Sequence, residues 1–161
     1  MLDGRVSDPA SAAGVPGSRL QATLLAFDYG ARWTGVAVGE RESGLAHPLT
    51  VIEARTDTAR LAAAEALVGT WCPTHLVVGL PLTLAGGEHR LAPAVRRFAA
   101  ALEGRFGLPV IFVDETLSSA EAESSLRESG RGGRAHKHLV HPVAAQRILQ
   151  DYFNDDRTAR R

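Results

Sequence analysis

The sequence has almost no cysteine, no excess of either charge and no long apolar run. Its 161 residues include one cysteine, Cys72, which excludes an intrachain disulfide and a thiolate metal cage and favours a reducing compartment. Lys and Arg together number 18, as do Asp and Glu. No overall field therefore attracts nucleic acid, and any such surface has to be local. No apolar stretch approaches the ~20 residues that a bilayer span requires.

Length and composition predict one folded domain with a tail at each end. Apolar residues make up 45% and charged residues 22% of the chain, which is typical of a globular protein. The first 20 residues are rich in Gly, Pro, Ser and Ala and lack the apolar core of a signal peptide. We therefore expect a flexible N-terminal tail (1–20), one domain (21–154), a flexible C-terminal tail (155–161) and a cytoplasmic location.

Hydrophobic patterns predict five strands and four helices. The predicted strands are 24–28, 35–39, 46–52, 75–79 and 109–113. The predicted helices are 58–69, 91–106, 118–129 and one that begins near Pro142. Pro48 interrupts the third strand and favours an edge position for it. A meander followed by alternating helices and strands predicts an α/β fold with a mixed five-stranded sheet, partly antiparallel and partly parallel, and helices on both faces.

A single acid ends the first apolar strand, in "LLAFDYGARWTGVAVGE" (24–40). In such sheets ligands gather at the carboxyl ends of strands; Asp28 ends the first strand, and Asp114 and Glu115 follow the last. Two carboxylates about 4 Å apart repel by roughly 4 kcal/mol at an effective dielectric near 20. Their proximity would favour a bound Mg²⁺ or Mn²⁺. The alternative is that Asp28 only starts an Asx-type turn before Gly30.

Three stretches carry a family resemblance: the one just quoted, "HLVVGLPLTLAGGEHRLAPAVRRFAAALEGRFGLPV" and "VDETLSSAEAESSLRESG". Together they resemble the Holliday-junction-resolvase-like YqgF/RuvX family, also described as pre-16S rRNA nucleases, over most of the chain. The resemblance implies a ribonuclease H-like fold, which agrees with the predicted element order. It also implies a metal-dependent phosphodiesterase acting on structured nucleic acid, with 5′-end processing of precursor 16S rRNA in ribosome biogenesis as the leading role.

The resemblance assigns Asp28 and Glu115 to a catalytic metal site, with Asp114 in support. The chain departs from the family pattern V-D-x-x-A-A, because "VHPVAA" puts His141 in the place of the third acid. An imidazole can bind a metal but adds no negative charge, and it suits Mn²⁺ better than Mg²⁺. His141 could instead act as a general base near neutral pH, or simply lie at a helix start. Asp151 is no substitute, since ten residues of helix span about 15 Å.

A second group of residues could hold or frame the substrate. A Gly-rich loop is predicted at "RESGRGGRAHKH" (127–138), and its cations could contact phosphates or merely be solvated. The candidates for phosphate contact are Arg32, Arg131, Arg134 and Lys137. The residues expected to shape the cleft after the fourth strand are Pro81, Thr83, Gly86 and Gly87. Trp33 could stack on a base or pack internally, and Trp71, at a helix end, better suits packing.

Two interpretations remain open beside rRNA processing. One is a Holliday-junction resolvase-like endonuclease that cuts branched DNA; the other is a weakly active or non-catalytic RNA- or ribosome-binding module, because His141 replaces an acid. The Asp28 turn also resembles a phosphate loop of actin-like ATPases, but those need two such domains, and no P-loop consensus is present. The expected cofactor is Mn²⁺ or Mg²⁺, and the expected partners are nucleic acid and ribosomal particles, with no membrane.

Overall fold

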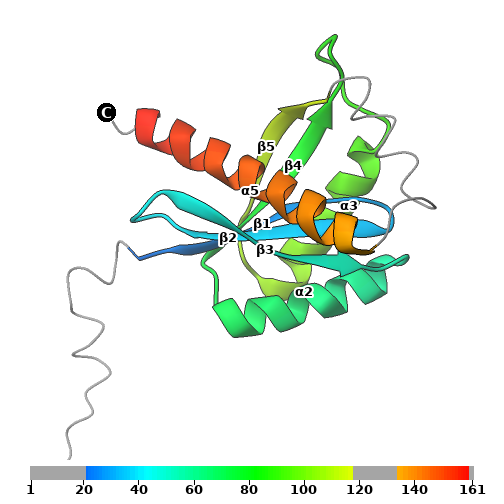
Figure 1. Ribbon diagram of the computed structural model, residues 1–161, viewed down its shortest axis with the longest axis horizontal. Helices are drawn as coiled ribbons and strands as arrows, with labels where there is room; N and C mark the ends of the chain where they lie inside the picture. Colours follow the sequence, from blue (N-terminus) through cyan, green and yellow to red (C-terminus); the bar gives the residue numbers. More distant parts are fainter. Residues whose placement is uncertain (1–20, 118–133, 160–161) are drawn as a thin grey trace, which may run out of the picture.

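The computed structural model describes residues 21–117 and 134–159, with side chains for 21–117 and 140–156 (Figure 1). In chain order its elements are β1 (Thr23–Asp28), β2 (Trp33–Glu40), β3 (Leu45–Glu53), α2 (Asp57–Trp71), β4 (His75–Leu82), α3 (Ala92–Phe106), β5 (Val110–Thr116) and α5 (Arg134–Ala159). The five strands form one sheet in the order β3-β2-β1-β4-β5. The pairs β1–β2 and β2–β3 are antiparallel, and the pairs β1–β4 and β4–β5 are parallel. The predicted mixed five-stranded sheet is confirmed.

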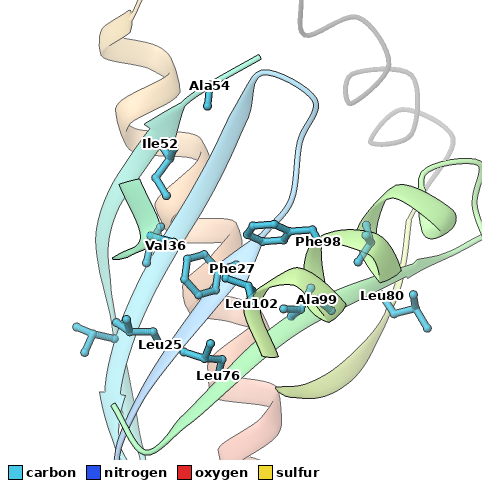
Figure 2. Packing of buried hydrophobic residues seen from close by; sticks show 14 of the residues in the cluster. Leu25, Phe27, Val36, Ile52, Ala54, Leu76, Leu80, Phe98, Ala99 and Leu102 are labelled. Carbon is cyan, nitrogen blue, oxygen red and sulfur yellow. The ribbon is translucent and has the colours of Figure 1, made fainter. Parts of the chain in front are cut away.

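One face of the sheet is covered by α2 and α3 (Figure 1). Every second residue of β1, including Leu25 and Phe27, points to this face and packs with Phe98 and Leu102 of α3 (Figure 2). Phe27 and Phe98 meet edge to face, with ring centroids 5.7 Å apart, an arrangement that aromatic rings favour. This face holds the larger of the two hydrophobic clusters.

Of the helices in the described ranges, α5 alone covers the opposite face (Figure 1). Here the strands present small side chains, such as Ala26 and Ala37, to Ile148 and Phe153 of the helix. A Cβ added at Gly39 would lie 2.7 Å from the Phe153 ring, a distance that real Cβ contacts essentially never show. Small residues on the strands therefore let α5 lie close against the sheet.

Two glutamines of α5 join the helix to the edge strand β3. Gln146 Nε2 donates to the Ala46 carbonyl oxygen at 3.0 Å. One turn further along, Gln150 accepts from the Ala46 N–H at 3.1 Å and donates to the Gly44 carbonyl oxygen at 2.9 Å. The helix is therefore held along β3 by hydrogen bonds as well as by apolar packing, which sets its position relative to the strand ends.

Among the helices of the described ranges, none has the length and apolar character needed to cross a bilayer.

The predicted element boundaries need three corrections. Helix α5 begins at Arg134 and ends at Ala159, so it includes 134–138, expected as loop, and 155–159, expected as tail. Pro142 was expected at its first turn, because a proline inside a helix removes one hydrogen bond and normally costs ~3 kcal/mol; here Pro142 is buried within the helix. Strand β5 runs to Thr116, so Asp114 and Glu115 lie within it. The predicted helix 118–129 lies outside the described residues.

Candidate functional site

Strand register brings Asp28 and Glu115 to the same end and the same face of the sheet. Phe27 of β1 pairs with Val78 of β4, so the next residues, Asp28 and Gly79, are neighbours. The Glu115 side chain leans back over this position, because a Cβ at Gly79 would lie 3.2 Å from Glu115 Oε2. Asp28 alternates with Leu24 and Ala26, which face α5. The two carboxylates therefore lie on the α5 face, on either side of a residue without a side chain.

Helix α5 brings His141 to the same place. Gly35 of β2 pairs with Asp28, and a Cβ at Gly35 would lie 2.0 Å from the His141 carbonyl oxygen. The backbone of His141 therefore rests directly on Gly35, beside Asp28. His141 is buried. The three residues predicted as ligands converge on one end of the sheet. Within the described residues, however, no group of three or more His, Cys, Asp or Glu side chains is arranged to hold a metal ion.

The Glu115 carboxylate is ion-paired with an arginine that the sequence patterns do not single out. Arg147 Nη2 of α5 donates to Glu115 Oε1 at 2.8 Å. The Glu115 side chain is 12% exposed and the Arg147 side chain 53% exposed. Arg147 directly precedes Ile148, one of the buried apolar residues of α5. This position next to the buried side of the helix is the one sequence signal that could have pointed to Arg147.

The residues present fit a hard divalent cation through two carboxylates rather than three protein ligands. Carboxylate oxygens are the preferred ligands of Mg²⁺, which is often held by one or two carboxylates together with water and substrate phosphates. Because Gly79 has no side chain, the Glu115 carboxylate and Ile148 of α5 can lie directly over the strand beside Asp28. Asp28 and Glu115 are thus the residues that could hold such an ion, and ligation by His141 remains a prediction.

A buried arginine fixes the turn that follows Asp28. This residue, Arg60, is 1% exposed and lies in the first turn of α2. Its guanidinium stacks on the Tyr29 ring, 4.7 Å from the ring centroid. The hydrogen-bond acceptors of Arg60 are the carbonyl oxygens of Gly30 (3.3 Å), Ala31 (2.8 Å) and Ala54 (3.0 Å), Thr34 Oγ1 (3.2 Å) and the Asp57 carboxylate. Because buried polar groups need partners, this one side chain satisfies several carbonyls of an otherwise irregular segment. The turn is thereby tied to α2.

Asp114 lies on the other side of the sheet from Glu115. Neighbouring residues of a strand point to opposite faces, and Ile111 and Val113, which share the parity of Glu115, pack toward α5. The intervening Phe112 ring stacks under Arg96 of α3, 5.5 Å from its centroid. A hydrogen bond to Glu88 and the charges of Glu88 and, more weakly, Asp114 raise the pKa of Arg96. Asp114 therefore acts electrostatically toward α3, and support of the acidic site by this residue remains a prediction.

Of the predicted phosphate contacts and base platforms, only Arg32, Trp33 and Trp71 have side chains within the described part of the chain. Arg32 Nη2 is 3.0 Å from Glu53 Oε2, and its guanidinium stacks on Trp33, which is 4% exposed and so offers no face to a base. Trp71 is at the end of α2, just before β4 begins, and thus at the far end of the sheet from Asp28. Arg131 lies outside the described residues. Arg134 and Lys137 lie in the first turns of α5, where side chains are not described.

The segment after β4 forms a tight turn at the same end of the sheet as the acids. The Thr83 N–H donates to the Gly87 carbonyl oxygen at 2.7 Å, and the Gly86 N–H donates to the Thr83 carbonyl oxygen at 2.9 Å. Gly86 has a φ of 92°, which favours glycine because it lacks a Cβ. Pro81, just before the turn, pairs with Glu115. The turn therefore lies at the rim of the candidate site.

The match to a family model and the similarity to relatives place this chain among nucleases. The chain belongs to the RuvX family, described as Holliday junction resolvase, whose model matches residues 22–155. The expected family membership is confirmed.

Two relatives share nearly half of their residues with this chain, and both are named "Putative pre-16S rRNA nuclease". The protein of Methylobacillus flagellatus is 50% identical over 139 residues, 86% of this chain and 95% of that protein. The protein of Thiobacillus denitrificans is 49% identical over 137 residues, 85% of this chain and 94% of that protein. Among solved structures, T. thermophilus RuvC in complex with Holliday junction substrate has 15% identity and a TM-score of 0.49, covering 83% of this chain and 94% of that one.

Proposed function

We propose that this protein is a metal-dependent nuclease that hydrolyses phosphodiester bonds in structured nucleic acid, with precursor 16S rRNA as its substrate. The observation that carries the proposal is the position of Asp28 beside Gly79 and of the Glu115 carboxylate over Gly79, at the end of the central strands. The names of the relatives support the choice of substrate. Processing of precursor rRNA would put the reaction in the cytoplasm and bring ribosomal particles within reach as partners.

In this mechanism the residues of the chain bind the cation and keep the site in position. Asp28 and Glu115 would hold a divalent cation, which when bound orients a water and stabilises charge on the phosphate oxygens. Arg60 keeps the Asp28 turn in place through the Gly30 and Ala31 carbonyls. His141, buried beside Asp28, would either add a nitrogen ligand, which favours higher activity with Mn²⁺ than with Mg²⁺, or accept the proton of the water.

A second substrate is favoured by one observation, the description of the matching family as Holliday junction resolvase. A four-way DNA junction and a precursor 16S rRNA both present branched or paired strands to the same acidic edge. Parallel cleavage assays on a labelled junction and on a precursor 16S transcript, each with Mn²⁺ and with Mg²⁺, separate the two. Binding of RNA without cleavage under any of these conditions would favour a non-catalytic module instead.

Asp28→Asn is the decisive variant for the proposal. It keeps the shape of the side chain and removes its charge, so we expect cleavage to fall by at least about 100-fold, while Tm stays within a few degrees. Gel assays of cleavage and thermal unfolding by circular dichroism measure the two effects. Full activity of the variant, with wild-type contamination excluded, would remove Asp28 from the mechanism.

A further inference from the structure

Arg147 contacts a carboxylate to which the proposed function assigns a cation. Its Nη2 atom is 2.8 Å from Glu115 Oε1, while Oε2 of the same carboxylate lies over Gly79, next to Asp28. The side chain of the acid is 12% exposed and that of the base 53% exposed. A largely buried carboxylate needs a compensating charge, and in this structure the guanidinium supplies it from the solvent side.

We propose that Arg147 is a phosphate-binding residue of this site, which pairs with Glu115 in the metal-free protein and with a backbone phosphate of the nucleic acid when a divalent cation binds the carboxylates. This inference rests on the proposed function, since it assumes that Glu115 receives the cation. A guanidinium and a divalent cation at one carboxylate repel each other. Binding of the cation therefore weakens the hold of Glu115 on Arg147.

The backbone of α5 keeps Arg147 within reach of the site after this exchange. Ile148, the next residue, packs on Gly79, where an added Cβ would be 2.6 Å from its Cδ1 atom. His141, six residues before Arg147, rests on Gly35. The stem of Arg147 is thus anchored on β2 and β4, the two strands that flank β1 with its Asp28, and only its half-exposed end has to move. A guanidinium binds two phosphate oxygens at once, which suits Arg for this task.

The charge of the site supports the same role. Asp28 and Glu115 supply two negative charges, and the family's third acid is replaced by His141. With Arg147 paired to Glu115, the site is less negative than three carboxylates would make it, so it repels an approaching phosphate backbone less. The arginine therefore lowers the affinity for the cation alone and raises the affinity for the cation together with nucleic acid.

The test compares Arg147→Gln with the wild-type protein and with Arg105→Gln. Arg105 also pairs with a glutamate, Glu65, at 2.5 Å, but on the α2 and α3 face, so it controls for the loss of one surface ion pair. Calorimetric titration with Mn²⁺ alone measures cation affinity. Fluorescence anisotropy of a fluorescein-labelled RNA hairpin, with and without Ca²⁺ and at several salt concentrations, measures phosphate binding.

We expect Arg147→Gln to bind Mn²⁺ about tenfold more tightly, because a competing charge is removed. The same variant should lose about tenfold in RNA affinity when Ca²⁺ is present, with the salt slope reduced by about one. Arg147→Lys, which keeps the charge but not the two-pronged geometry, should resemble wild type with Mn²⁺ and fall between the two on RNA. Arg105→Gln should match wild type in both measurements.

Two failures are distinguishable. Measurable Mn²⁺ binding and Asp28-dependent cleavage, with both affinities unchanged in Arg147→Gln, would overturn the role of Arg147 and leave the nuclease intact. No Mn²⁺ binding by wild type or by Arg147→Gln would overturn the metal-dependent nuclease and this inference together.

Discussion

The two faces of the sheet differ in the size of the side chains that cover them. Toward α2 and α3 the strands present large residues such as Leu25 and Phe27 (Figure 2). Toward α5 they present mainly alanines and the glycines at 35, 39 and 79, with Leu24 and Val77 among them. Large side chains bury more apolar area and contribute more stability. Small side chains let the backbone of α5 come close to the strands. The second face therefore determines where α5 lies, and with it the place of His141 and Arg147 beside the acids.

The largest effect on stability is expected from the large-residue face. Leu102 of α3 is fully buried in the cluster that Phe27 and Phe98 also join. Leu102→Ala should lower the free energy of unfolding by about 2–5 kcal/mol, because it removes apolar contact and leaves a cavity. Urea unfolding followed by circular dichroism measures the loss. At a temperature where the variant is folded, its Mn²⁺ affinity should equal that of wild type; a weakened affinity would contradict the division between the faces.

Arg60 is the exception that tests this division, since it lies on the large-residue face but reaches the turn after Asp28. Arg60→Met should cost about 3 kcal/mol, because the buried carbonyls of Gly30 and Ala54 lose their donor. Cleavage should also fall in conditions where the variant is folded, since the turn is no longer tied to α2. Arg60→Lys, which restores one charge and some donors, should recover part of both. If the Arg60→Met variant were destabilised but still cleaved at the wild-type rate, Arg60 would contribute to stability alone and not to the site.

A smaller loss of stability, with a larger loss of function, is expected from Gly35→Ala. The added methyl would lie 2.0 Å from the His141 carbonyl oxygen, so α5 has to shift, at a cost of about 1–3 kcal/mol. Cleavage rates should fall even at a temperature well below Tm, where the loss of stability leaves the variant folded. Gly69→Ala is the matched control, because nothing lies within 4 Å of its Cβ position in α2, and it should gain up to about 1 kcal/mol. Equal activity of both variants would contradict the role assigned to the close approach.

The strand pattern and the acid at the end of β1 could be predicted from sequence because alternation and strand ends are local properties. The family resemblance then supplied Glu115 and His141, which no local pattern joins to Asp28. The partners of these residues were not predictable, since Arg147 and Glu115 are 32 residues apart in sequence and meet only after α5 has packed across the sheet. The start of α5 was misplaced at Pro142, because local propensity disfavours a proline inside a helix and burial against the sheet overrides it.

The outer rim of β3 has a consequence for how this protein behaves at high concentration. Pro48 provides no N–H there, and the pairing of β2 and β3 shifts register between Val36 and Ala37. The side chain of Gln150 already takes up the N–H of Ala46 and the carbonyl of Gly44. A strand of another molecule would find few evenly spaced partners along this border, so the chain resists growing its sheet into fibrous aggregates from that side.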